Sequence, residues 1–201
     1  MADGKVASRS ALAGLASLQR AGAATPTAGV RIREIVDFAA IGIIARRGRN
    51  GEVCAILSRH AGAPVRDAAK RAGSGNLAIT GTAPGQWLAM RRGPDAQAPL
   101  DGVRADLDGL AAVTDQGDGR AVLEISGSRA RDALAKGIPV DLDSLVFKVG
   151  DAAQTSASHI GLQIALIDDA PTFEIISARS TAESLWSWLV ASAAEYGIDV
   201  V

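Results

Sequence analysis

Aromatic residues, cysteine and histidine are scarce in this sequence. Aromatic residues make up 3% of it, and it contains one cysteine and two histidines. A single cysteine excludes an internal disulfide and leaves the cellular compartment open, with the cytoplasm as the default expectation. The 22 acidic residues nearly balance the 21 basic ones, so the chain lacks the basic excess of nucleic-acid binders. We therefore expect no nucleic-acid partner.

Long apolar runs are missing as well. No run approaches the roughly 18 residues needed to cross a bilayer, so we expect no membrane partner. Near the N-terminus leucines recur every third residue (Leu12, Leu15, Leu18). This is a helical stripe, unlike the solid apolar block of a signal peptide. We interpret residues 1–29 as an N-terminal arm and linker whose three leucines contact a partner; a frayed tail is the alternative.

Metal-ligand and nucleophile patterns are also absent. The histidines, His60 and His159, have no metal-ligand spacing to each other, to Cys54 or to a carboxylate cluster. Cys54 lies in the apolar run Val53–Leu57, which favours a buried, inert thiol over a reactive one. The sequence therefore predicts no metal site.

Nucleotide-binding and hydrolase motifs are missing too. There is no phosphate-binding Gly-Lys-Ser/Thr loop and no Gly-x-Ser-x-Gly elbow. The carboxylate pairs Asp141/Asp143 and Asp168/Asp169 fall in predicted turns, where aspartate is common for its turn-forming hydrogen bonds. We assign no catalytic or cofactor-binding residue to this chain.

The clearest pattern that is present lies between Gly119 and Leu142. Ala121, Leu123 and Ile125 alternate with Val122, Glu124 and Ser126, as on a β-strand. A short helix is expected to follow, capped by Ser126 or Ser128. Gly137 is placed to be its C′ residue, and Pro139 prevents its continuation.

The other segments predict further strands and helices. In the first half we expect strands near 30–36 and 39–45, a strand or helix at 51–59, a helix over Pro64–Ala72, a hairpin of 76–81 with 86–91, and a helix over 100–110. In the second half we expect a connection at 142–149, a hairpin of 160–167 with 172–177, and a helix from Ser180 to near Gly197 that begins with the capping-box spacing of Ser180 and Glu183.

The two halves of the chain show the same order of elements. Each reads as strand, helix, hairpin and helix, and both hairpins turn at an Ala-Pro pair, Ala83–Pro84 and Ala170–Pro171. We predict an α+β fold of two βαββα modules, residues 30–112 and 113–201, related by a pseudo-repeat.

Two tryptophans of the last helix fall on different faces. At about 100° per residue, Trp186 shares a face with Leu185 and Leu189, whereas Trp188 lies near the polar Ser184 and Ser187. Trp186 is therefore predicted to be a core residue and Trp188 a partner contact. The alternative is that a loop of the same chain covers Trp188.

Several stretches of the chain carry a family resemblance. SGSRARDALAKGIPVDL, GDAAQT and AESLWSWLVASAAEYG, within about Leu110 to Gly197, resemble the gamma subunit of heterotetrameric sarcosine oxidase, with thinner matches at Arg9–Leu12 and Ala83–Leu88. More distantly, AVTDQGDGRAVLEISGSRARDAL is similar to the aminomethyltransferase (T-protein) superfamily. That second resemblance implies an aminomethyltransferase folate-binding-domain-like fold.

The resemblance implies a function for the complex and a role for the chain. The chain would be a non-catalytic structural subunit, with alpha, beta and delta subunits as partners. The complex would demethylate sarcosine to glycine, forming hydrogen peroxide and 5,10-methylenetetrahydrofolate. FAD, FMN, NAD, tetrahydrofolate and zinc would lie on the partner subunits and no cofactor on this chain.

Two alternative functions remain at this stage. One is the equivalent subunit of an N-methylglutamate dehydrogenase complex, and the other is a stand-alone folate-dependent aminomethyltransferase-like enzyme.

Overall fold

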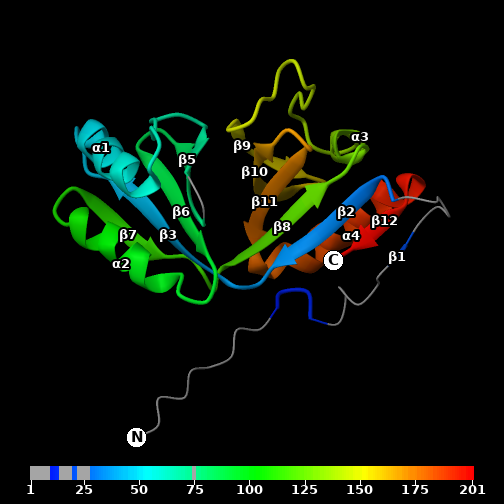
Figure 1. The fold of residues 1–201 in the computed structure, drawn as a ribbon, viewed down its shortest axis with the longest axis horizontal. Coiled ribbons are helices and arrows are strands. Elements are labelled where there is room, and N and C mark those ends of the chain that lie inside the picture. Colours follow the sequence, from blue (N-terminus) through cyan, green and yellow to red (C-terminus); the bar gives the residue numbers. More distant parts are fainter. Residues whose placement is uncertain (1–9, 14–19, 22–27, 74–75) are drawn as a thin grey trace, which may run out of the picture.

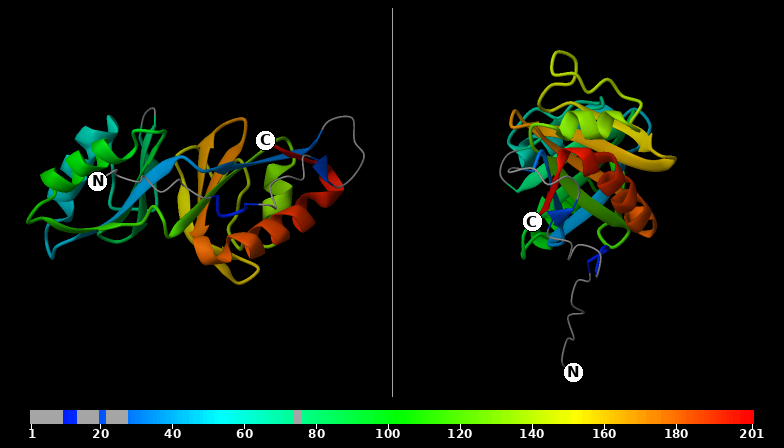
Figure 2. Two further views of the ribbon diagram at one scale, coloured as in Figure 1. Left: turned by 90° about the horizontal axis from the view of Figure 1, so that it is seen from below. Right: turned by 90° about the vertical axis from the view of Figure 1, so that its right-hand side faces the viewer.

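Two twisted β-sheets meet through their inner faces, and helices cover both outer faces (Figures 1 and 2). The structure is a computed structural model that describes residues 10–13, 20–21, 28–73 and 76–201. Leu15 and Leu18 lie outside the described residues.

The larger sheet has seven strands, in the order β1-β12-β2-β8-β11-β10-β9. Helices α3 and α4 pack against its outer face (Figure 2). The strands are β1 (Arg20–Ala21), β2 (Val30–Ile35), β8 (Arg120–Ser126), β9 (Ala152–Ala157), β10 (Ile160–Asp168), β11 (Thr172–Ala178) and β12 (Ile198–Val200). The helices are α3 (Ala130–Ala135) and α4 (Ala182–Ala193), the latter flanked by the 3₁₀ turns η1 (Arg179–Thr181) and η2 (Ala194–Tyr196).

The smaller sheet has five strands, in the order β4-β5-β6-β3-β7. Its outer face is covered by α1 (Asn50–Ala61) and α2 (Gln97–Asp106). The strands are β3 (Phe38–Ala45), β4 (Arg71–Ala72), β5 (Leu77–Ala83), β6 (Gln86–Arg92) and β7 (Ala111–Asp115).

The two units repeat one topology, so the predicted α+β fold with a pseudo-repeat is confirmed. Residues 38–115 and 120–200 each run strand, helix, three strands, helix and strand, and they place their strands in the same order. The larger sheet differs because β2 is inserted between β8 and β12, antiparallel to the first and parallel to the second. The two hairpins with the Ala-Pro pairs, β5–β6 and β10–β11, occupy equivalent places.

The predicted module boundaries need correction. Strand β2 falls in the predicted first module but belongs to the larger sheet, where it pairs with β8. Strand β7 spans the predicted boundary at 112/113 and pairs with β3 of the smaller sheet. Each module also contains two strands more than the predicted βαββα. One of them lies between the first helix and the hairpin, and the other follows the second helix. The additional strands β4, β7, β9 and β12 are short or lack a strong apolar alternation, so pattern alone did not reveal them.

Strands β8 and β11 are buried on both faces. The predicted alternation is confirmed, because Leu123 and Ile125 face the core beneath α3 and α4. Val122, on the other face, meets Ala40 and Met90 of the smaller sheet. Packing of the two sheets therefore buries a face that usually meets water in a two-layer protein.

The helix caps differ from prediction. No side chain caps α3; instead the Arg129 amide donates to the Gly29 carbonyl at 3.0 Å, so Ser126 and Ser128 are not its caps. The capping box at Ser180 is wrong as well, since Thr181 is the N-cap residue of α4 and makes no side-chain cap bond. Its hydroxyl donates to the Ala178 carbonyl at 2.9 Å.

Residues 51–59 form part of helix α1, but the helix predicted over Pro64–Ala72 is wrong. Hydrogen bonds from distant residues hold this segment as a loop that leads into β4. Trp87 Nε1 donates to the Arg66 carbonyl at 3.0 Å, and the Asp67 carboxylate accepts the Gly85 amide at 2.6 Å. Tertiary contacts outweigh the local helix signal here.

Leu12 lies in the core of this chain, so its assignment as a partner contact is corrected. The Glu34 carboxylate on β2 accepts the Ser10 hydroxyl at 2.5 Å and the Ala11 amide at 2.9 Å. These hydrogen bonds hold the arm against the larger sheet. The Leu12 side chain is buried there in the core, with 1% of its surface exposed. The expectation that the leucines of the arm contact a partner therefore fails at Leu12.

Replacing Leu12 by alanine should lower the free energy of unfolding of the isolated chain by about 2 kcal/mol, the lower end for a buried leucine, since neighbours of a terminal segment relax more readily. Urea unfolding measures this change. Ala13→Gly, at an exposed neighbouring position, is the control. An unchanged midpoint for Leu12→Ala would show that the arm does not contribute to the core.

Candidate functional site

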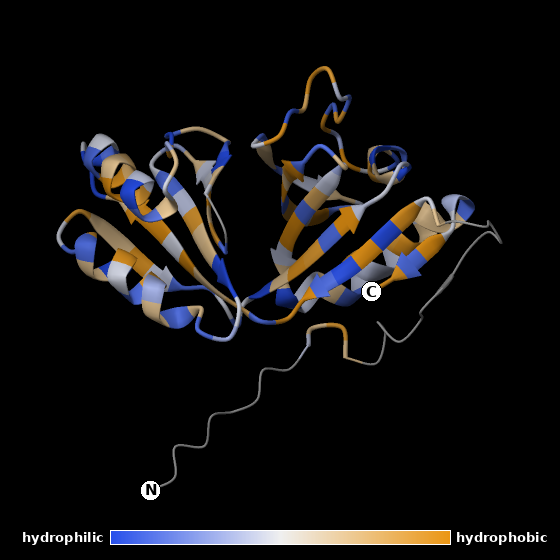
Figure 3. Ribbon diagram, viewed as in Figure 1, coloured by the Kyte–Doolittle hydropathy of each residue, from blue (hydrophilic) through white to orange (hydrophobic). Residues whose placement is uncertain are grey.

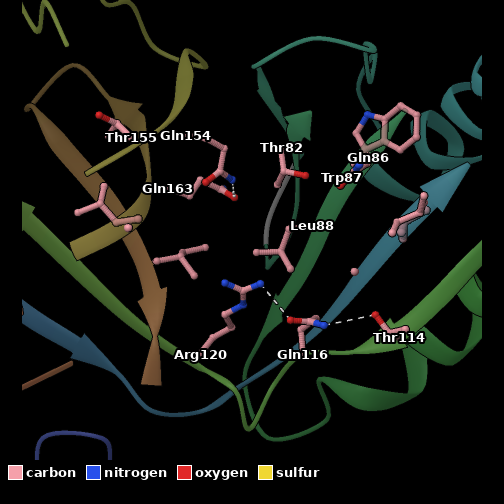
Figure 4. A pocket seen from close by; sticks show the side chains of 16 residues that line it. Thr82, Gln86, Trp87, Leu88, Thr114, Gln116, Arg120, Gln154, Thr155 and Gln163 are labelled. Carbon is pink, nitrogen blue, oxygen red and sulfur yellow. Dashed lines mark hydrogen bonds between the residues drawn. The ribbon is translucent and has the colours of Figure 1, made fainter. Parts of the chain in front are cut away.

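A cavity of about 440 Å³ lies between the two sheets (Figure 4). Both modules contribute to its wall: β3, β5, β6 and β7 from one, and β8, β9, β10 and β11 from the other. Its polar lining residues are Thr82, Gln86, Thr114, Gln116, Arg120, Gln154, Thr155 and Gln163. No carboxylate stands among the described residues that line it, so Arg120 gives the cavity a net positive charge.

Arg120 points into this cavity from the start of β8 (Figure 4). Its Nη2 donates to Gln116 Oε1 at 3.0 Å, and Gln116 Nε2 donates to Thr114 Oγ1 at 3.3 Å. Its Nε is buried without a hydrogen-bond partner, and none of the described carboxylates forms an ion pair with it.

Gln163 lines the cavity from β10, which is separated from the strand of Arg120 by β11 in the same sheet (Figure 4). The residue is 4% exposed, and its Oε1 accepts Gln154 Nε2 at 3.2 Å. Its own Nε2 has no hydrogen-bond partner among the described residues. A buried amide donor without a partner costs about 1–3 kcal/mol, so both Gln163 and Arg120 present unfilled hydrogen-bonding capacity.

A network of ion pairs joins the two sheets near this cavity. Glu124 on β8 and Glu174 on β11 are directly opposite each other in the strand pairing, and both are buried. Arg92 of the smaller sheet bridges the two carboxylates. Arg33 Nε also donates to Glu124 at 3.0 Å, and Arg71 Nε donates to Glu174 at 3.2 Å. Sequence reasoning missed this network, because the two glutamates meet only through strand pairing.

The network sets the charge state of Glu124. Burial would raise the pKa of Glu124, but its hydrogen bonds and charge interactions with Arg33 and Arg92 are stronger in sum and lower it. Burial likewise opposes the charge on Arg92, while the two glutamates raise its pKa. Glu124 and Arg92 are therefore ionised at neutral pH and bind each other.

The other candidates from the sequence, His60, His159 and Cys54, are not among the described residues that line the cavity. His60 Nε2 lies 2.9 Å from Asp106 Oδ2, and His159 occupies the β9–β10 turn with a φ of 71°. Cys54 is half-buried on α1, and burial, with a smaller effect of the Asp67 charge, raises its thiol pKa. A raised pKa disfavours the reactive thiolate. Within 10–13, 20–21, 28–73 and 76–201, no group of three or more His, Cys, Asp or Glu residues could hold a metal ion.

The predicted turn roles of the aspartates are confirmed where side-chain bonds are present. Asp141 and Asp143 each accept the amide two residues ahead, at 3.0 and 2.7 Å, and Asp168 accepts the Ala170 amide at 2.9 Å.

No helix in the described part of the chain is long and apolar enough to cross a membrane.

The tryptophans of α4 lie as follows. Trp186 is 3% exposed in the core, as predicted. Trp188 is half-buried, because its ring lies over Gly137: a Cβ built there would be 2.8 Å from Trp188 Cζ2. Any larger residue at position 137 would therefore clash with the Trp188 ring. Gly137 does not have the positive φ of a left-handed C′ residue, so the close approach of Trp188 is what requires glycine here. The rest of Trp188 lines an open hollow of about 490 Å³ with Pro139 and His159.

The loop between α3 and β9 exposes apolar residues that sequence reasoning did not single out. The loop projects from the rest of the fold (Figures 1 and 3), and within it Leu145 is 82% exposed and Val146 is 57% exposed. Phe147 beside them is buried and stacks on Phe173 with ring centroids 6.4 Å apart. Val149 of the same loop is also exposed. The loop is therefore anchored while it presents three large apolar side chains.

This two-module architecture is the aminomethyltransferase-like fold. The chain superposes on glycine cleavage system aminomethyltransferase T from Bartonella henselae with a TM-score of 0.60 and 17% identity, over 84% of this chain and 49% of that one. Residues 52–195 match the model of a family described as SoxG: sarcosine oxidase, gamma subunit family. The chain belongs to this family.

Two individual relatives are more similar. A chain of heterotetrameric sarcosine oxidase from Corynebacterium sp. U-96, solved in complex with pyrrole 2-carboxylate, gives a TM-score of 0.81 and 26% identity, over 94% of this chain and 95% of that one. Sarcosine oxidase subunit gamma from Corynebacterium sp. (strain P-1) is 27% identical over 177 residues, which are 87% of this chain and 86% of that protein.

Proposed function

We propose that this chain is the non-catalytic structural subunit of a four-subunit sarcosine oxidase. The observation that carries the proposal is the match along nearly the whole chain to one chain of a heterotetrameric sarcosine oxidase. In this proposal the complex oxidatively demethylates sarcosine to glycine, with hydrogen peroxide and 5,10-methylenetetrahydrofolate as further products. FAD, FMN, NAD, tetrahydrofolate and zinc are bound by the alpha, beta and delta subunits.

The buried charges support a structural role. Glu124 and Glu174 are the buried carboxylates of the described chain, and Arg92 and Arg71 of the smaller sheet bind them. A general acid or base needs a free position beside its substrate and a pKa near the working pH. The pKa of Glu124 moves away from neutrality. These carboxylates therefore stabilise the packing of the two sheets.

We infer that two surfaces contact the other subunits. One is the tip of the α3–β9 loop, where Leu145 and Val146 are exposed on an anchored loop. The other is the hollow that contains Trp188. Large apolar side chains held in place before binding lose little conformational entropy on association, which favours them as interface anchors. Leu15 and Leu18 remain proposed contacts of the arm.

The isolated chain tests the non-catalytic assignment. We expect the purified full-length chain to be colourless and to show no sarcosine turnover, whereas the assembled complex shows flavin absorbance and peroxide formation. Stoichiometric flavin in the isolated chain, or turnover by it alone, would sink the assignment. Oxidation of N-methylglutamate in place of sarcosine by the complex would instead support the dehydrogenase alternative.

Replacing Trp188 by alanine should weaken assembly by about 2 kcal/mol, roughly 30-fold in the dissociation constant. It should change the stability of the free chain less than Trp186→Ala does, because Trp188 is only half-buried. Surface plasmon resonance with the partner subunits and urea unfolding of the free chain measure the two effects. Ser187→Ala, at the exposed neighbouring position, is the control. Equal destabilisation by both tryptophan variants with unchanged assembly would contradict the interface assignment.

A further inference from the structure

We propose that the cavity between the two sheets binds a small organic carboxylate that also carries a hydrogen-bond acceptor. The volume of about 440 Å³ falls within the roughly 300–1,000 Å³ of small-molecule sites. The proposal does not depend on the assembly of the chain with other subunits, since every residue that carries it belongs to this chain.

Arg120 selects the charge of the ligand. Its guanidinium faces the cavity without a carboxylate partner among the described residues, and its Nε is buried with no acceptor. A half-buried guanidinium is stabilised by an anion, and its planar fork fits the two oxygens of a carboxylate. Among the described residues that line the cavity, Arg120 is the one cation. A single negative charge therefore matches it better than a phosphate dianion, half of whose charge would stay uncompensated.

Gln163 selects the second polar group. The residue is 4% exposed and its Nε2 has no partner, while its Oε1 already accepts a bond from Gln154. Turning both amides end for end would exchange donor and acceptor but would still leave one polar atom of Gln163 unpaired. As the amides stand, the unfilled site is a donor, so the ligand must supply an acceptor. Gln154 is exposed, so rotation of its side chain opens access to Gln163.

The wall between these two residues is apolar. Ile176 is on β11, between the strands of Arg120 and Gln163, and Leu88 and Leu162 also line the cavity. All three are buried. The body of the ligand that joins its carboxylate to its acceptor is therefore apolar or aromatic.

Three ring compounds of the same size test this assignment on the full-length chain. Nicotinate carries a carboxylate and a ring acceptor, benzoate carries the carboxylate alone, and nicotinamide carries the ring acceptor without a charge. We expect nicotinate to bind with a dissociation constant of about 1 mM, the scale for a ligand of nine heavy atoms. Benzoate should bind about tenfold more weakly and nicotinamide more weakly still, as measured by saturation-transfer NMR.

Two variants locate the binding. Arg120→Gln should weaken nicotinate binding about tenfold and leave nicotinamide binding unchanged, since a charged hydrogen-bonded pair is lost. Gln163→Leu should reduce nicotinate binding to the level of benzoate. Arg59→Gln, at an exposed position on α1 on the outer side of the smaller sheet, should change neither. Circular dichroism and the thermal midpoint show whether each variant is folded, and the second variant keeps the test decisive if the first unfolds.

The proposal is overturned if nicotinate does not bind at about 10 mM, or if neither Arg120→Gln nor Gln163→Leu changes its binding. It is also overturned if nicotinate is excluded from the assembled complex and Arg120→Gln weakens assembly, since a carboxylate of a partner subunit then fills the cavity. None of these results bears on whether the chain assembles into a sarcosine oxidase, which is measured separately.

Discussion

Replacing Arg92 by methionine is expected to lower the free energy of unfolding of the isolated chain by about 3–5 kcal/mol. Glu124 and Glu174 face each other across paired strands, and like charges in that position repel. Arg92 bridges both carboxylates. Its removal leaves two adjacent buried anions with one remaining arginine each. Urea unfolding followed by circular dichroism measures the change.

The control for this change is Arg59→Met, which removes an exposed arginine from α1 and should cost less than about 0.5 kcal/mol. Adding Glu174→Gln to Arg92→Met should recover part of the loss, because one of the two facing charges is then gone. If Arg92→Met behaves like Arg59→Met, the two sheets are not held together by this network.

The same network predicts a pH dependence. The native pKa of Glu124 is lowered from its ordinary value of 4.5. The unfolded chain therefore binds this proton more readily than the native chain. The stabilisation is complete above pH 4.5 and is lost as the pH falls through the lower native pKa. The difference between the wild-type chain and Arg92→Met should thus be largest near neutral pH and shrink below pH 4.5. A difference that stays constant down to acid pH would contradict the ion-pair explanation.

Replacing Trp186 by alanine should cost about 3–5 kcal/mol of stability. The Trp186 side chain is 3% exposed and belongs to the core between the larger sheet and helices α3 and α4. Its truncation therefore leaves a cavity that α4 cannot close. Thermal and urea unfolding of the isolated chain measure the loss. Trp186→Phe, which keeps an aromatic ring, should cost clearly less. A loss below about 1 kcal/mol for Trp186→Ala would show that α4 is not packed as described.

Much of the fold could be predicted because its signals are local. The alternation around Leu123 and the equivalent Ala-Pro turns, at Ala83 and Ala170, come from neighbouring residues. These patterns gave the pseudo-repeat and both hairpins, and helical periodicity separated Trp186 from Trp188. The turn roles of Asp141 and Asp143 follow from side-chain bonds that span two residues.

The remaining features depend on contacts between distant segments. Strand β2 joins the larger sheet because it pairs with β8 and β12, and the sequence pattern of residues 30–35 does not reveal this pairing. Leu12 is buried because Glu34 binds the arm. The cavity could not be predicted for the same reason, since Arg120 and Gln163 come together through the pairing of β8, β11 and β10, and the opposite wall of the cavity comes from the smaller sheet.

The central claim is that this chain is required for the four-subunit complex to assemble and has no chemistry of its own. Coexpression of the partner subunits with and without this chain, followed by native mass spectrometry and a peroxide assay on sarcosine, tests it most directly. We expect one copy of this chain in each flavin-containing complex, and loss of the intact complex and its activity when the chain is omitted. A fully active flavin complex that forms without this chain, or that excludes it when it is present, would contradict the account.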